Sequence, residues 1–189
     1  PPTKEQIDVT GNESPLKGFI RVFTTIWVQF VAITIDYFWT FAVFAGIFLG
    51  IHYDEGSMKQ STSAQITTFM YMTGDMLARL LYFIPIPFNK WVIFGFSCVR
   101  CVLYVPIFIY YYNVYTNPYL MFFIMLVFSV SHGYFGSWAM QLAYKSVKFT
   151  DMNITGGLLA LAPDIGLAFG ATVLFILQLV LPSNVQASD

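Results

Sequence analysis

The polar residues with the clearest chemical potential in this sequence are an acid and a base four positions apart, Asp75 and Arg79. At positions i and i+4 of a helix, two side chains lie on one face and within reach of each other. The sequence around them is largely apolar and long enough to cross a membrane. An ionisable side chain at membrane depth costs at least about 2.5 kcal/mol on insertion scales, so by default it indicates a functional site.

Asp75 and Arg79 allow two interpretations. The first is an internal ion pair that only neutralises two buried charges, and the second is a polar face that lines a water-filled path. We favour the path, because a purely structural pair can be replaced by apolar residues at little cost. Arginine can also donate in a fork to a hydroxyl, a carbonyl or a ring nitrogen of a ligand.

Two other charged residues, Asp36 and Arg100, also fall inside apolar stretches. Asp36 is seven residues after Gln29 and four before Thr40, so the three share a helical face. Asp36 is expected either to bond a neighbouring helix or to contact a ligand. Arg100 has the same two alternatives, a structural partner such as an acid of a neighbouring helix, or a role in ligand binding.

A histidine, His132, lies in the stretch Phe-Ser-Val-Ser-His-Gly-Tyr-Phe-Gly. Ser129 is three residues before it and Gly136 is four after it, so this helical face is small and polar. A lone histidine in a helix is usually a satisfied packing residue. On this face, His132 either packs against its neighbours or lines a substrate pathway. Ser129 would line the same pathway.

A proline directly followed by an acid, Pro163-Asp164, interrupts the last apolar stretch. Proline removes an intrahelical hydrogen bond and frees the carbonyl around Leu159. A kink beside a carboxylate suggests a hinge or an ion site, and the alternative is a helix cap at a local break. Asp36, His132 and Asp164 together motivate a further hypothesis of proton coupling.

Composition places all these residues in a polytopic membrane protein. The 189 residues are 57% hydrophobic and only 10% charged, whereas soluble domains carry about 25% charged residues. Apolar runs longer than about 18 residues recur, and each can cross a bilayer. Open sheets cannot cross lipid, and a barrel would show short alternating segments instead. The predicted fold class is therefore all-α.

Five membrane spans are expected, separated by polar loops. Residues 1–18 are predicted to form a cytoplasmic loop or linker, residues 19–181 a five-helix transmembrane bundle, and residues 182–189 an extracytoplasmic tail. The segment 52–65 is predicted to be a loop. In the last span, Gly166-x-x-x-Gly170 permits close contact between helices. The expected spans are residues 19–51, 66–84, 91–112, 119–144 and 154–181.

The basic residues in the loops orient these spans. With five spans, six of the loop lysines and arginines fall on one side, and only Lys59 falls on the other. Under the positive-inside rule this bias predicts a cytoplasmic N-terminus and an outer C-terminus. The expected location is the plasma membrane. The six residues are Lys4, Lys17, Arg21, Lys90, Lys145 and Lys148.

Four stretches of the sequence resemble the C-terminal half of the equilibrative nucleoside transporter family, spans seven to eleven of an eleven-span protein. The combination of Asp-x-x-x-Arg with the later Ser-x-Gly-Tyr segment carries most of the resemblance. The sequence departs from the family at Phe44-Ala-Gly46, where Phe-Pro-Gly is expected, and at His132, where many members have asparagine. The four stretches are residues 68–79, 100–106, 128–134 and 155–170.

The resemblance implies a fold similar to the major facilitator type, with two helical bundles around a central cavity and transport by alternating access. It implies nucleosides or nucleobases as substrates, with Asp75 and Arg79 at the positions that contact them. The implied partners are the substrate, an N-terminal six-helix half of the same transporter and the lipid bilayer. With the residues discussed above, the candidate substrate-binding residues are Asp75, Arg79, His132, Ser129 and Asp36.

Other function classes are less well supported by the sequence. No basic stripe suggests nucleic acid, and neither a cofactor nor a metal is expected, since Cys98 and Cys101 lack a second pair or a nearby histidine. An enzyme is not expected, because no nucleophile–base pair or phosphate loop occurs. The alternative is a non-transporting scaffold or receptor whose charges pair among themselves. A carrier would instead gather Asp75, Arg79 and His132 or Ser129 in one place.

Overall fold

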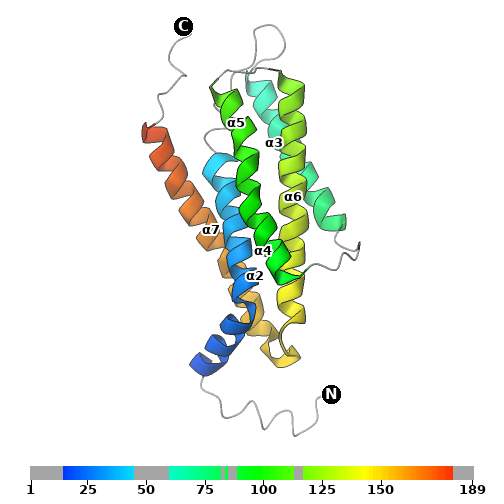
Figure 1. Ribbon diagram of the computed structural model, residues 1–189, viewed down its shortest axis with the longest axis vertical. Helices are drawn as coiled ribbons and strands as arrows, with labels where there is room; N and C mark the ends of the chain where they lie inside the picture. Colours follow the sequence, from blue (N-terminus) through cyan, green and yellow to red (C-terminus); the bar gives the residue numbers. More distant parts are fainter. Residues whose placement is uncertain (1–14, 45–59, 82–83, 85–88, 113–116, 181–189) are drawn as a thin grey trace.

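The computed structural model describes residues 15–44, 60–81, 84, 89–112 and 117–180, and within these ranges all regular structure is helical (Figure 1). The all-α prediction is therefore confirmed. The short 3₁₀ turn η3 joins α4 to α5 end to end, and a second one, η4, leads directly into α7. The helices are α2 (Pro15–Phe44), α3 (Gln60–Leu80), α4 (Lys90–Val99), η3 (Arg100–Leu103), α5 (Tyr104–Tyr111), α6 (Pro118–Lys145), η4 (Phe149–Asp151) and α7 (Met152–Val180).

Four helical segments of the described chain are long and apolar enough to cross a membrane. One of them is a composite, because α4, η3 and α5 continue one another as a single rod (Figure 1). The others are formed by α2, by α6, and by η4 with α7. Their bounds are Leu16–Ala42, Lys90–Tyr111, Pro118–Lys145 and Phe149–Leu177. The chain is thus a polytopic membrane protein.

The helix α3 is the fifth long helix, and it is amphipathic. At about 1.5 Å per residue its 21 residues extend for about 31 Å, which matches the hydrocarbon core. The side chains of Ser63, Thr67 and Tyr71 are buried, while those of Phe69 and Met72 on the other side are exposed. This polar inner face makes α3 less apolar than the four segments that are apolar enough to cross a membrane.

Several helix boundaries differ from the prediction, and α3 ends at Leu80, four residues before the predicted end at 84. The loop predicted at 52–65 is wrong for residues 60–65, because α3 already begins at Gln60. The polar residues at the start of α3 look like a loop in the sequence, but Ser63 is buried in the bundle. The first helix begins at Pro15, four residues before the predicted start at 19. Proline suits the first turn of a helix, where its missing N–H is not needed.

Glycines in α7 allow it to cross α2 at close range. A Cβ atom on Gly166 would lie 2.4 Å from the carbonyl oxygen of Thr34, and one on Gly170 would lie 2.7 Å from the carbonyl oxygen of Phe38. The contact between α2 and α7 is the most extensive between two helices of the described chain. The prediction of close helix contact at Gly166-x-x-x-Gly170 is therefore confirmed.

The substitution Gly166→Ala is expected to lower the thermal stability of the protein in detergent. The added methyl group meets backbone, which cannot rotate away, and overpacking of this kind costs about 1–3 kcal/mol. Gly157→Ala is the matched control, because the same helix leaves open space around Gly157. Equal melting temperatures for the two variants would show that α2 and α7 are not in close contact.

The chain begins and ends its path through the bundle at opposite ends. In Figure 1, α2 starts at the end where α6 stops and α7 starts, and α7 stops at the other end. Arg21 at the start of α2 donates to a carboxylate oxygen of Asp151 at 2.9 Å, which joins α2 to the turn before α7. The exposed Lys17, Lys145 and Lys148 belong to the same helix ends.

Candidate functional site

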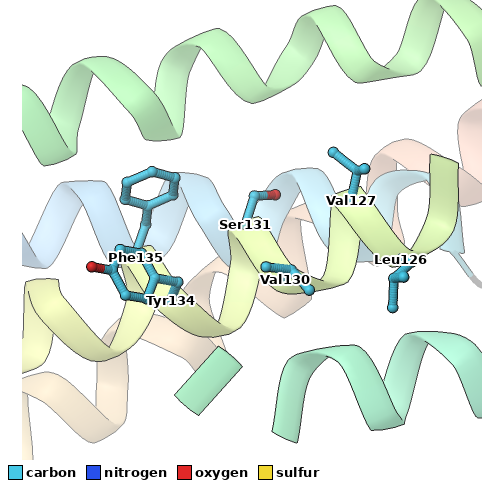
Figure 2. A pocket seen from close by; sticks show the side chains of 6 residues that line it. All are labelled: Leu126, Val127, Val130, Ser131, Tyr134 and Phe135. Carbon is cyan, nitrogen blue, oxygen red and sulfur yellow. The ribbon is translucent and has the colours of Figure 1, made fainter. Parts of the chain in front are cut away.

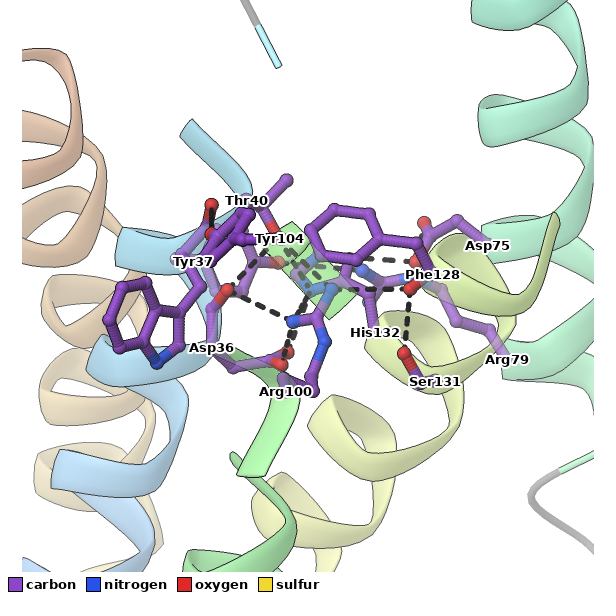
Figure 3. A network of polar contacts seen from close by, with 11 residues as sticks. Asp36, Tyr37, Thr40, Asp75, Arg79, Arg100, Tyr104, Phe128, Ser131 and His132 are labelled. Carbon is purple, nitrogen blue, oxygen red and sulfur yellow. Dashed lines mark hydrogen bonds and ion pairs between the residues drawn. The ribbon is translucent and has the colours of Figure 1, made fainter. Parts of the chain in front are cut away.

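Seven polar side chains meet in the interior of the bundle, and together we call them the polar network (Figure 3). They come from four separate elements, α2, α3, η3 and α6. Arg100 lies about midway along the rod of α4, η3 and α5, and His132 lies about midway along α6. The network is therefore at membrane depth. Its members are Asp36, Tyr37, Thr40, Asp75, Arg79, Arg100 and His132.

The first ion pair of the network joins Asp36 of α2 to Arg100 of η3. The two side chains are only 1% and 3% exposed. Arg100 Nη1 donates to Asp36 Oδ1 and to the backbone oxygen of Asp36, and Nη2 donates to the backbone oxygen of Phe128 at 3.2 Å. The guanidinium also lies 4.4 Å from the centre of the Phe128 ring. Of the two alternatives for Arg100, the acidic partner on a neighbouring helix is confirmed.

The second ion pair joins Asp75 and Arg79 within α3, as their spacing predicts. Arg79 Nε donates to Asp75 Oδ2 at 2.8 Å, and Arg79 Nη2 donates to the Tyr37 hydroxyl at 3.4 Å. The side chains of Arg79 and Asp75 are 36% and 20% exposed, so this pair is far more accessible than Asp36 and Arg100. The other oxygen, Asp75 Oδ1, is buried and accepts no hydrogen bond from the described residues.

His132 of α6 lies between the two ion pairs. Its Nδ1 is 2.6 Å from Asp36 Oδ2, and its Nε2 is 4.0 Å from Asp75 Oδ1. The ring meets the edge of Tyr37 at 4.7 Å between centroids and stacks near Tyr71 at 6.2 Å. With His132 neutral, two carboxylates and two guanidiniums balance to zero charge. His132 therefore lies between a carboxylate of each pair.

A close crossing of α3 and α6 brings Asp75 to His132. A Cβ atom on Gly133 would lie 2.4 Å from the backbone oxygen of Asp75, and one on Gly74 would lie 2.1 Å from Ser129 Oγ. Each helix therefore has a glycine at the contact, and such small residues let the helices of a membrane bundle pack closely. The geometry of the accessible ion pair depends on this crossing.

Ser129 is placed at the crossing itself, apart from the charged groups. Its side chain is fully buried, and its hydroxyl donates to the backbone oxygen of Leu126 at 2.9 Å. Packing against Gly74 therefore accounts for this serine. The role of Ser129 in substrate binding, suggested by its closeness to His132 in the sequence, stays a prediction. In this arrangement its hydroxyl proton is already used in a hydrogen bond within α6.

Asp164 lies outside the polar network. Its side chain is exposed on α7, and it makes no hydrogen bond or ion pair with any residue that the structure describes. The alternative of a helix cap at a local break is wrong, because α7 continues through Pro163 without interruption. Thr34 of α2 donates to the carbonyl of Ala162 at 3.2 Å, directly beside the proline. A hinge or a proton-coupling group at Pro163 and Asp164 stays a prediction.

Two tyrosines near the charges were not singled out from the sequence. Tyr71 could have been found, because Ser63, Thr67, Tyr71, Asp75 and Arg79 recur at four-residue intervals along one face of α3. Tyr37 could not, because its contact with Arg79 joins positions 42 residues apart on different helices.

A separate pocket of about 400 Å³ lies on α6 and contains no member of the network (Figure 2). Four of its six lining side chains are hydrocarbon, and the two others are Ser131 and Tyr134. Ser131 already donates to the backbone oxygen of Phe128 at 2.7 Å. The pocket offers apolar surface and little polar chemistry, so the network remains the candidate functional site. The lining residues are Leu126, Val127, Val130, Ser131, Tyr134 and Phe135.

The fold and the site define a polytopic membrane protein that gathers paired charges at membrane depth. Its sequence is 25% identical to equilibrative nucleoside transporter 4 of Danio rerio, over an alignment of 159 positions that covers 79% of the chain. The chain spans 29% of the length of that relative. This similarity confirms the resemblance to the equilibrative nucleoside transporter family. No family model matches the sequence, and no solved structure matches it.

Proposed function

We propose that the chain is part of a membrane transporter that moves nucleosides or nucleobases by alternating access. Asp75 and Arg79 contact the substrate. The observation that carries the proposal is the accessible ion pair at membrane depth, in which the side chains of Arg79 and Asp75 are 36% and 20% exposed. The similarity to a protein named as a nucleoside transporter gives the substrate class. Because the chain matches only 29% of that relative's length, we propose that an N-terminal half of the transporter is its partner.

The chemistry of the pair suits a nucleoside. Each oxygen of a carboxylate can accept more than one hydrogen bond, so the partly exposed Asp75 side chain can also accept from a sugar hydroxyl or from an N–H group of a base. Arg79 uses Nε and Nη2 within the protein, and its Nη1 forms no hydrogen bond to the described residues. Nη1 can therefore donate to a hydroxyl or a ring nitrogen. A donor beside an acceptor matches a ligand with both kinds of group along one edge.

In this proposal, the remaining members of the network hold Asp75 and Arg79 in place. Asp36 is sealed between Arg100 and His132, so it holds the site in place and does not touch the substrate. His132 lies between the carboxylates of Asp36 and Asp75. In the membrane, the basic helix ends at Lys17, Lys145 and Lys148 face the cytoplasm, under the positive-inside rule. The plasma membrane is the proposed location.

The proposal is tested by uptake of labelled nucleosides into cells that express the full-length protein or its Asp75→Asn variant. We expect uptake to fall at least about tenfold, because losing a hydrogen bond to a charged group costs about 1.5–3 kcal/mol. Arg21→Gln is the matched control, since it removes an ion pair that lies at the bundle end, away from the network. Undiminished uptake with Asp75→Asn, at equal surface expression, would remove this residue from the substrate site.

The second candidate function is a non-transporting membrane scaffold or receptor. The pairing of each acid with a base favours it, because Asp36 with Arg100 and Asp75 with Arg79 already neutralise each other. A folded, membrane-inserted wild-type protein that takes up neither nucleosides nor nucleobases would support the scaffold over the transporter.

A further inference from the structure

The hydroxyl of Tyr37 bridges two helices, α2 and α3, that otherwise have little direct contact. The most extensive helix contacts of the described chain join α2 to α7 and α3 to α6. The pair α2 and α3 is not among the helix pairs with extensive backbone contact in those ranges. Across this junction, the Tyr37 hydroxyl accepts a hydrogen bond from Arg79 Nη2 at 3.4 Å (Figure 3).

The ring of Tyr37 is held on both sides. Behind it, a Cβ atom on Gly166 of α7 would lie only 2.9 Å from the Cβ atom of Tyr37, so the α7 backbone is directly adjacent. In front, its ring meets His132 in an edge-to-face arrangement at 4.7 Å between centroids. Edge-to-face pairs are favourable for aromatic rings. The hydroxyl is therefore presented from a fixed position.

The bond to Tyr37 fixes the plane of the Arg79 guanidinium. The bond from Nε to Asp75 alone leaves the group free to tilt about that single hydrogen bond. The second bond, from Nη2, removes this freedom. Arginine otherwise carries about 2 kcal/mol of rotamer entropy, and binding improves when such freedom is lost before the ligand arrives.

We infer that Tyr37 is a positioning residue for the substrate site, which aims Arg79 Nη1 at an acceptor of the ligand. The inference rests on the proposed function. Tyr37 acts through Arg79 and need not touch the substrate. Tyr37 is therefore expected to affect substrate affinity, and to do so only while residue 79 is an arginine, whose guanidinium has the forked shape.

The test is nucleoside uptake by the full-length protein carrying Tyr37→Phe, which removes only the hydroxyl. We expect the apparent KM to rise about tenfold with little change in maximal rate. In an Arg79→Lys background, Tyr37→Phe is expected to change nothing further, because lysine lacks the fork. Tyr110→Phe is the matched control, since its buried hydroxyl bonds the backbone of Asn117, away from the network. An unchanged KM, or equal effects in both backgrounds, would overturn the inference.

The same variants separate failure of this inference from failure of the proposed function. A wild-type protein that transports nucleosides, with an unaffected Tyr37→Phe variant, refutes only the inference. A folded wild-type protein without transport refutes the proposed function and, with it, the substrate role of Tyr37. In that case the bridge is judged by melting temperatures of the two single variants and the double variant. Additive shifts would show that Tyr37 and Arg79 do not interact.

Discussion

Replacing Arg100 by alanine is expected to remove most of the folded protein from the membrane. The variant leaves the Asp36 carboxylate 1% exposed and without its guanidinium partner. It also deprives the backbone oxygen of Phe128 of the hydrogen bond from Arg100. Breaking a buried ion pair by removing one partner costs about 3–5 kcal/mol, a large part of the total stability of most domains. Size-exclusion profiles and melting temperatures of the purified protein measure the effect.

Two controls identify the unpaired charge as the cause. The double variant Asp36→Leu with Arg100→Met is expected to recover most of the stability, because apolar residues of similar volume replace buried ion pairs at little cost. Arg21→Ala breaks a pair with Asp151 whose side chains are 47% and 10% exposed, so water can reach the site and we expect a clearly smaller loss of stability than for Arg100→Ala. If Arg100→Ala melted like Arg21→Ala, Asp36 would not be sealed inside the bundle.

Replacing Gly133 by valine is expected to lower both the stability and the transport activity. Even the Cβ atom of alanine would lie 2.4 Å from the Asp75 backbone oxygen and 3.0 Å from the Ala78 Cβ atom. Valine adds two further methyl groups to this contact. We expect a loss of at least about 3 kcal/mol, at the upper end for overpacking. In variants that still fold, α3 must move away from α6, which carries Asp75 away from His132.

The two readouts distinguish this effect from loss of the carboxylate. Gly133→Val is expected to lower the melting temperature and the uptake together, whereas Asp75→Asn is expected to lower uptake with a smaller effect on melting. Gly95→Ala is the control for a helical glycine without neighbours, since nothing lies within 4 Å of its added Cβ atom. Full uptake by Gly133→Val would show that the crossing does not set the position of Asp75.

The sequence was sufficient where the interaction is local. Asp75 and Arg79 pair because four residues separate them on one helix, and this spacing is visible without a structure. The close approach at Gly166 and Gly170 was likewise predictable, because small residues at this spacing form one flat stripe. In both cases a short segment contains all the geometric information that the prediction needs.

The sequence was insufficient where the partner lies on another helix. Arg100 had two open alternatives, since nothing in its own span shows that Asp36, 64 residues earlier, lies opposite. His132 had the same difficulty, because its place between two carboxylates depends on how α6 packs against α2 and α3. The start of α3 was missed because hydropathy measures average polarity and ignores which face is polar.

The amphipathic character of α3 bears on how the protein is made. A helix with Ser63, Thr67, Asp75 and Arg79 along one side has weak affinity for lipid on its own. During synthesis, α3 leaves the ribosome well before α6, the helix against which it packs most extensively. We therefore expect stable integration of α3 into the bilayer to depend on α6, and the glycines at the α3–α6 crossing to matter for insertion as well as for the finished site.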